Sequence, residues 1–190
     1  MRSEYYQWGV GLWGATTIIW LLGILASKRT VLRQSPSSRS LQSGLTLLAY
    51  FMVFSRYFRS GWLAERYLPP SDSVAAVGLL LTLLGLAFAV WARVQLGRNW
   101  SGAVTLKEDH QLIRRGPYAV VRHPIYTGLL LGILGMALII GEVRGLLGFV
   151  ILFVAFRLKC RTEEAFMRQQ FGEQYTQYQH DVKALIPFIY

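Results

Sequence analysis

The stretch RRGPYAVVRHPIYTG, residues 114–128, concentrates charged and aromatic side chains between two long apolar runs. Within it, Arg122 and His123 directly precede Pro124. Proline is favoured in the first turn of a helix, where its missing N–H group is harmless. A helix that begins there presents unpaired N–H groups and the positive end of its dipole beside Arg122 and His123. The sequence therefore predicts an anion-binding corner, suited to a carboxylate or a phosphate.

Two adjacent carboxylates, Glu163 and Glu164, stand in a basic stretch that follows the last apolar run. Lys159 precedes Glu163 by four residues and Arg161 precedes Glu164 by three, so each pair can share a helix face. Such pairs are commonly surface ion pairs worth only about 0.2–1 kcal/mol. The alternative is that Glu163 faces the anion-binding corner, while Glu164 points about 100° away on the same helix.

Five apolar segments position these groups. Each has about 18–20 residues, the length that a helix needs to cross about 30 Å of hydrocarbon. The chain of 190 residues is 53% hydrophobic and 16% charged, with a mean hydropathy of +0.35, which is typical of membrane proteins. We predict an all-α integral membrane protein, a single domain over 1–190, with three spans in 1–92 and the polar site in 93–190. The predicted spans are 7–26, 41–58, 73–92, 124–141 and 143–160.

The net charge of +10 is distributed unevenly along the chain. The loops 27–40 and 93–123 and the tail from 157 hold most of the basic residues, and the opposite ends of the spans hold few. Because positively charged loops remain in the cytoplasm, we predict an N-terminus outside and a cytoplasmic C-terminus and site. Basic residues at the ends of spans are suited to anionic lipids rather than to nucleic acid.

Glycines and turns predict how the second half packs. Three glycines near one face of 124–141 would allow close helix approach, and the short turn 141–145 predicts a tight antiparallel hairpin. The segment 163–178 has an amphipathic pattern interrupted by Gly172, suited to lying over a pocket. One cysteine, Cys160, excludes an internal disulfide framework, and the scattered histidines give no metal-ligand spacing.

Four features, in their order along the chain, resemble the isoprenylcysteine carboxyl methyltransferase family, which is grouped with phospholipid N-methyltransferases. They are HQLIRRGPYAVVRHPIYTG, a two-span hairpin, RTEEAFMRQQFGEQYTQY and a terminal IPF. The resemblance covers roughly 97–188. It implies a membrane methyltransferase that uses S-adenosylmethionine without a Rossmann domain, and no G-x-G-x-x-G motif follows a strand here. It implies a cofactor pocket built by 106–126 and covered by the C-terminal segment. The cofactor-binding positions that we expect are His110, Leu112, Gly116, Tyr118, Arg122, His123, Pro124, Tyr126 and Glu164.

The resemblance places Glu163 at the family's catalytic-region glutamate. The family often has Arg four residues earlier, where this chain has Lys159, which lacks the bidentate grip of Arg on a carboxylate. Which of Arg157, Lys159 and Arg161 orients the substrate therefore stays open, although we expect Lys159 and Arg161 to belong to the catalytic group.

The predicted reaction is methyl transfer to a lipophilic acceptor in the membrane, such as a lipidated carboxylate of the isoprenylcysteine type. A phospholipid amine is the first alternative. A sterol-type reductase that uses NADPH is a second, disfavoured because Tyr126 is followed by Thr127 and Gly128 instead of a Gly-Glu pair. A non-catalytic scaffold is a third. The sequence leaves open the acceptor and the oligomeric state.

Overall fold

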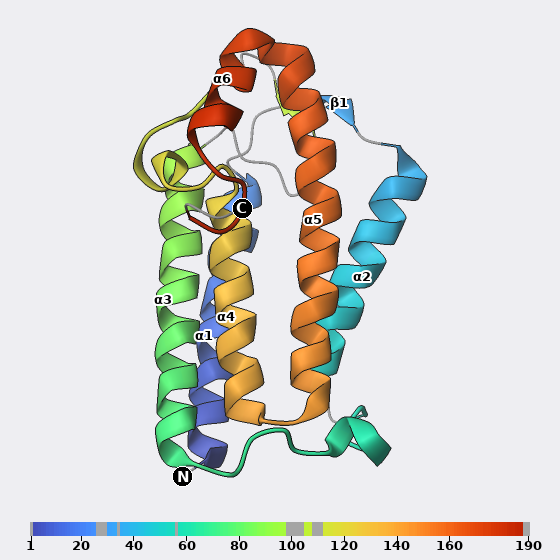
Figure 1. Ribbon diagram of the computed structural model, residues 1–190, viewed down its shortest axis with the longest axis vertical. Coiled ribbons are helices and arrows are strands. Elements are labelled where there is room, and N and C mark those ends of the chain that lie inside the picture. The colour runs from blue at the N-terminus through green and yellow to red at the C-terminus, as the bar shows by residue number, and fades with distance from the viewer. Residues whose placement is uncertain are drawn as a thin grey trace.

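The computed structural model describes residues 2–25, 30–33, 35–55, 57–97, 105–107 and 112–187. Within these residues, five long helices run up and down alongside one another (Figure 1). They are α1 (Arg2–Leu25), α2 (Pro36–Phe54), α3 (Asp72–Leu96), α4 (Pro124–Ile140) and α5 (Val143–Phe171). The shorter elements are β1 (Thr30–Arg33), η1 (Gly61–Ala64), β2 (Thr105–Lys107), η3 (Gly116–Ala119) and α6 (Glu173–Asp181).

The predicted helical fold is confirmed, with changes at its edges. Each predicted span coincides with a long helix, but α2 ends at Phe54 because Ser55 is extended. The helix α5 continues far past the predicted end at 160, so the predicted helix 163–178 is not one element. The chain turns at Gly172, whose φ of +51° favours glycine, and α6 follows. The antiparallel pair of β1 with β2 was not predicted.

Only α3, among the described residues, has both the length and the apolar composition to cross a membrane by itself. The helix α4 is also apolar but has 17 residues. The helix α5 is long, yet Arg144 and Arg157 bound its apolar stretch. The length and composition of α3 therefore support the membrane prediction more strongly than those of α4 and α5.

The glycines of α4 bring it into close contact with α3. A Cβ atom added at Gly128 would lie 2.4 Å from the carbonyl oxygen of Gly85, and one at Gly135 would lie 2.4 Å from that of Gly78. The Thr82 hydroxyl also donates a hydrogen bond across this contact, to an α4 carbonyl 3.2 Å away. The predicted close approach is thus confirmed, and its partner is α3.

The turn between α4 and α5 forms the predicted hairpin. Gly141 ends α4 with a φ of +62°, and α5 begins two residues later. Because the two helices are antiparallel and rise equally per residue, the part of α5 near Cys160 returns to the level of the first turn of α4. The rings of Tyr126 and Phe156 stack there, 4.6 Å apart.

Candidate active site

The imidazole of His123 lies between the two consecutive carboxylates of α5. Its Nδ1 is 3.3 Å from Oε2 of Glu163, and its Nε2 is 3.1 Å from Oε1 of Glu164. Since each ring nitrogen faces a different carboxylate, both glutamates face the start of α4. The prediction that Glu164 points away from this corner is therefore wrong. Glu163 and Glu164 are about 100° apart around the axis of α5, but the two ring nitrogens of His123 are far enough apart to contact both carboxylates.

Arg122 fills the other side of the predicted corner. Its Nε and Nη2 donate to Oε1 of Glu164 at 3.0 and 2.7 Å. Its Nη1 donates to the carbonyl oxygens of Gln179 and Val182. The predicted anion-binding corner is thus occupied by a carboxylate of the protein itself. Arg122 is thus a link between α4, α5 and the segment after α6.

Glu163 has a different set of neighbours. The Tyr126 hydroxyl donates to its Oε1, and the ring of Tyr126 stacks on that of His123 at 5.8 Å. The ammonium of Lys159 lies 5.5 Å from the centre of the same tyrosine ring. The Glu163 side chain is 25% exposed, against 14% for Glu164. Glu163 is therefore the glutamate of the pair whose side chain is more exposed.

The segment after α6 covers the first turn of α4 (Figure 1). The backbone N–H groups of Arg122 and His123 donate to the carbonyl oxygens of Lys183 and Ala184, at 2.8 and 3.0 Å. The Thr127 hydroxyl donates to the next carbonyl, of Leu185, at 2.7 Å. These bonds satisfy N–H groups that a helix start leaves unpaired. The predicted cover over this region is therefore attached through backbone hydrogen bonds.

The contacts among His123, Glu163, Glu164 and their neighbours, here called the cluster, also shift the pKa values of these groups. Burial alone would lower the pKa of His123, but Cys160 and the two carboxylates raise it well above 6.5. Burial opposes ionisation of Glu164, yet His123 and Arg122 lower its pKa to about 2. Burial likewise opposes ionisation of Glu163, while His123, Tyr126 and Lys159 hold the pKa below its usual value. Both glutamates are thus carboxylates at neutral pH.

The structure brings together six of the predicted residues: Arg122, His123, Tyr126, Lys159, Glu163 and Glu164. Pro124 begins α4 beside them. Tyr118 is buried behind them against Ala92, and burial raises its pKa well above 10. Leu112 is half-buried, and Gly116 begins η3 with a φ of +62°. Arg161 is exposed on α5 and forms no ion pair with Glu164, which turns instead to α4. His110 lies outside the described residues.

Sequence reasoning missed two members of the cluster. The amide of Gln179 donates to Oε2 of Glu164 at 2.9 Å, and Cys160 lies close enough to His123 to raise the pKa of the imidazole. Cys160 precedes Glu163 by three residues, so helix periodicity could have placed it on the same face. No local pattern identifies Gln179, because its contact depends on the turn at Gly172.

Comparison with known proteins agrees with this arrangement. Residues 74–174 match the model of the phospholipid methyltransferase family. Over 118 residues the chain is 38% identical to the protein-S-isoprenylcysteine O-methyltransferase of Schizosaccharomyces pombe, covering 60% of this chain and 49% of that protein. It is 26% identical to protein-S-isoprenylcysteine O-methyltransferase B of Arabidopsis thaliana, covering 98% of this chain and 87% of that protein.

A solved structure is similar as well, that of the eukaryotic intramembrane Ras methyltransferase, isoprenylcysteine carboxyl methyltransferase. The TM-score is 0.56 at 26% identity, over 84% of this chain and 55% of that one. The helical packing is thus similar to that of an intramembrane methyltransferase. The chain belongs to the phospholipid methyltransferase family, and the matched part contains most of α3, all of α4 and both carboxylates of α5. It spans about half the length of the yeast relative.

Proposed function

We propose that this chain transfers a methyl group from S-adenosylmethionine to the carboxylate of a lipophilic acceptor in the membrane, of the isoprenylcysteine type. The observation that carries the proposal is the partly open carboxylate of Glu163, which Tyr126 and His123 hold at the start of α4. The relatives named as isoprenylcysteine O-methyltransferases supply the reaction class.

The residues present fit the proposed cofactor. When bound, S-adenosylmethionine supplies a methyl group on a positively charged sulfur, and an ionised carboxylate is a suitable neighbour for that charge. Glu163 is ionised at neutral pH and remains partly exposed. Together with it, the segment from Leu112 to Tyr118 and the covering residues after α6 would hold the cofactor. Arg122 and His123 contribute indirectly in this proposal, because they already hold the two carboxylates.

The chain's own contribution to methyl transfer is alignment. The donor is already activated, so a methyltransferase mainly has to hold donor and acceptor in line. Lys159 is the cation that we assign to the acceptor carboxylate, because it lies over Tyr126 beside Glu163. Arg161 is exposed on another face of α5. An assay of Lys159→Gln and Arg161→Gln tests this choice, since only the former should raise the KM for the acceptor.

A carboxylate acceptor suits the cluster better than a phospholipid amine. An amine must lose a proton before it can attack a methyl group, whereas a carboxylate is ionised at neutral pH. A good general base has a pKa near the working pH. The pKa of Glu163 is instead below its usual value, because His123, Tyr126 and Lys159 stabilise its charged form against burial. Glu163 is thus a weak base, and it is better suited to an electrostatic interaction with the proposed cofactor than to removing a proton from an amine.

The proposed setting is a membrane crossed by all five long helices, with the N-terminus outside and the C-terminus and site in the cytoplasm. The cluster and the end of α5 lie at one end of the helices, and the N-terminus lies at the other (Figure 1). Lys and Arg gather at the first end, where anionic lipid headgroups would contact them. Large apolar side chains exposed on the helix flanks would face lipid, and include Trp8, Ile18, Leu22, Leu47, Leu80 and Leu84.

Two measurements test the proposed function. Purified protein should transfer labelled methyl from S-adenosylmethionine to an S-prenylated cysteine acid and not to phosphatidylethanolamine. Calorimetry should detect binding of S-adenosylhomocysteine. Transfer to the phospholipid alone would show that the acceptor is a phospholipid amine rather than a carboxylate. Absence of both binding and transfer would overturn the proposal. A reporter fused after Tyr190 tests the orientation separately, since it should report the cytoplasm.

A further inference from the structure

An aromatic segment, residues 57–68, contains η1 and lies at the end of the helices opposite the cluster (Figure 1). Three of its rings are exposed, those of Tyr57 at 85%, Trp62 at 60% and Tyr67 at 36%. Exposed aromatic side chains gathered in this way usually mark a surface that another molecule covers. The candidate active site does not include any of these residues, so the proposed reaction does not account for their exposure.

Hydrogen bonds fix the last part of this segment to the turn between α4 and α5. The Val143 N–H group donates to the carbonyl oxygen of Glu65 at 2.9 Å, and the Tyr67 N–H group donates to that of Gly141 at 3.1 Å. The Tyr67 hydroxyl donates to the carbonyl oxygen of Ala137 at 2.9 Å, in the last turn of α4. The height of the aromatic segment along α4 is therefore fixed.

Charged side chains fix the first part of the segment. Oε1 of Glu142 is 3.2 Å from Nε of Arg59, and Oε2 is 2.7 Å from Nε of Arg144. Arg144 also donates to the carbonyl oxygen of Ser55, directly after α2, at 3.3 Å. Glu142 and Arg144 are buried, and such a pair is costly to break when its hydrogen bonds are satisfied. Arg59 and the end of α2 are therefore both held against the start of α5.

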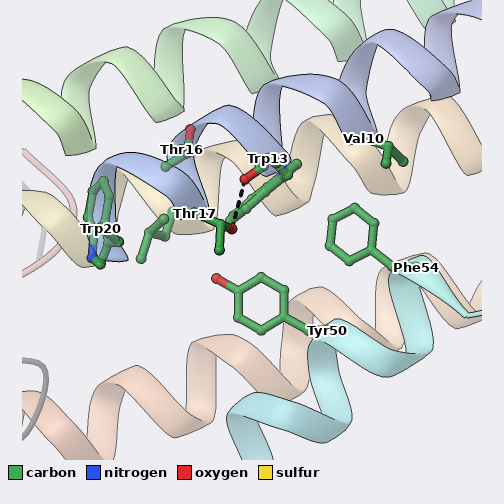
Figure 2. A pocket seen from close by; sticks show the side chains of 9 residues that line it. Val10, Trp13, Thr16, Thr17, Trp20, Tyr50 and Phe54 are labelled. Carbon is green, nitrogen blue, oxygen red and sulfur yellow. Dashed lines mark hydrogen bonds between the residues drawn. The ribbon is translucent and has the colours of Figure 1, made fainter. Parts of the chain in front are cut away.

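The position of α2 depends largely on α5, because a cavity of about 490 Å³ lies between α1, α2 and α4. Figure 2 shows Tyr50 and Phe54 facing α1 across this space. One bond that α1 does contribute comes from the Tyr6 hydroxyl, which donates to the carbonyl oxygen of Phe54 at 3.3 Å. The packing of α2 on α5 therefore determines where the aromatic segment begins.

The exposed rings continue a surface that starts on α2. The ring of Phe51, which is 48% exposed, lies 6.0 Å from that of Tyr57 and 5.4 Å from that of Phe58. Leu47, one turn earlier on α2, is 69% exposed. In the membrane setting proposed above, this flank of α2 faces lipid. Lipid that covers Leu47 and Phe51 therefore also reaches Tyr57.

The aromatic segment suits the headgroup region of a bilayer better than the hydrocarbon core. Its backbone is irregular, since η1 has four residues and Gly61 begins it with a φ of +56°. Ser60 and Glu65 are exposed, and the side chain of Arg59 is 66% exposed. Irregular backbone and charged side chains are costly in hydrocarbon, whereas Trp and Tyr gather where headgroups meet water. This combination therefore indicates headgroups as the partner.

The length of α4 agrees with this placement. The aromatic segment is attached at one end of α4, and the cluster lies at the other. The 17 residues of α4 rise by about 25 Å, which is close to the thickness of about 30 Å of the hydrocarbon core. A segment held in one headgroup region therefore places the cluster near the other.

We propose that the aromatic segment lies among the lipid headgroups on the side of the membrane opposite the cluster. Tyr57 and Trp62 insert their rings between headgroups, and the exposed part of the Arg59 guanidinium contacts lipid phosphates. The inference rests on the membrane setting proposed above and not on methyl transfer. In this position the cluster lies near the opposite interface, where a polar cofactor from water and a lipophilic acceptor from the bilayer meet.

Spin labels on introduced cysteines test this placement in purified protein reconstituted into phosphatidylcholine bilayers. Cys160 is 1% exposed, so labelling is directed to the introduced cysteine. Trp62→Cys is compared with Leu84→Cys, at an exposed side chain half way along α3, and with Glu173→Cys, at an exposed residue just beyond α5. The 29 residues of α5 rise by about 43 Å from the hairpin, so Glu173 lies outside a core of about 30 Å.

Collisions of the label with a water-soluble nickel chelate and with oxygen report its depth, because the chelate is concentrated in water and oxygen in hydrocarbon. In Trp62→Cys, collisions with the chelate should be several-fold fewer than in Glu173→Cys and several-fold more than in Leu84→Cys. Collisions with oxygen should also be intermediate. Tyr57→Cys should behave as Trp62→Cys does, and provides a second measurement at a separate ring.

Three outcomes would overturn the inference. Values equal to those of Glu173→Cys would place the aromatic segment in water, and values equal to those of Leu84→Cys would place it in hydrocarbon. Few collisions with both reagents would show that protein covers the segment, as in contact with a second copy of the chain. The measurement uses neither cofactor nor acceptor. A headgroup depth in a protein that methylates nothing would therefore retain this inference and overturn the proposed function.

Discussion

Arg122 before α4 and Glu164 on α5 form an ion pair in which both side chains are nearly covered. Nη2 and Oε1 are 2.7 Å apart, and the side chains are 10% and 14% exposed. Removing two charges from water costs free energy unless further hydrogen bonds satisfy the pair. Here Gln179 donates to the free oxygen of Glu164, and Arg122 donates to two carbonyl oxygens near α6. The pair therefore joins the start of α4 to the end of the chain.

Replacing Glu164 by Gln should destabilise this junction. Arg122 would remain covered without its carboxylate, at a cost that we place at about 1–3 kcal/mol, below the value of about 3–5 for a fully buried pair. Thermal unfolding in detergent should show a lower Tm, and amide exchange should be faster in 173–187. The control is Glu173→Gln, at an exposed residue outside the cluster, which should change stability by about 0.5 kcal/mol or less. Equal effects in both variants would show that the ion pair contributes nothing.

Replacing Glu163 by Gln should instead reduce turnover. The shape of the side chain is kept, and the bond from Tyr126 can still be accepted, but the charge next to the proposed cofactor is lost. Because Glu163 is proposed to hold the cofactor in line with the acceptor, its loss should misalign the two and lower kcat, in addition to any weakening of cofactor binding. Single-turnover methyl transfer, measured together with Tm, distinguishes this variant from Glu164→Gln. A wild-type rate in Glu163→Gln would remove Glu163 from the catalytic group.

The stability that His123 provides should depend on pH. Its pKa is near 6.5 when unfolded, and in the folded protein Cys160 and the two carboxylates raise it against the effect of burial. A group with a raised folded pKa stabilises fully below about pH 6.5, and this contribution disappears as pH rises through the folded pKa. The Tm advantage of the wild type over His123→Gln should therefore shrink as the pH rises above about 6.5.

A constant Tm difference across that range would show that the charge of His123 does not contribute. His180→Gln provides the control, because that side chain is 85% exposed and lies outside the cluster. It should leave the pH dependence of the wild type unchanged.

Replacing Gly128 by Ala should disturb the contact of α3 with α4. The new methyl group would lie 2.4 Å from the carbonyl oxygen of Gly85, so the helices would have to separate. Overpacking of this kind costs about 1–3 kcal/mol, which should lower the Tm. Gly44→Ala on α2 is the control, because its added methyl group meets nothing within 4 Å and alanine favours a helix. A normal Tm for Gly128→Ala would indicate that α3 and α4 can move apart freely.

The local order of residues determined where the main elements begin and end. Pro124 predicts the start of α4, Gly141 predicts the hairpin, and long apolar runs predict five helices. Each signal acts within a few residues, through a missing N–H group, a positive φ or the burial of neighbouring side chains. Six residues of the cluster were also predictable, because the motif around Arg122 and the two carboxylates of α5 resemble one family.

Only the tertiary structure decided how those residues pair. From the spacing along α5, Glu164 was expected to face away from the corner, yet Arg122 and His123 bind it. The reason is that charge pairing across helices depends on how two helices are placed against each other, which no local spacing encodes. The same holds for the cavity between α1 and α2, because its walls come from three separate helices, one of them distant in sequence from the other two. The sequence by itself determined the helices and most of the residues that gather at the start of α4, whereas long-range packing added Gln179 and decided which atoms meet.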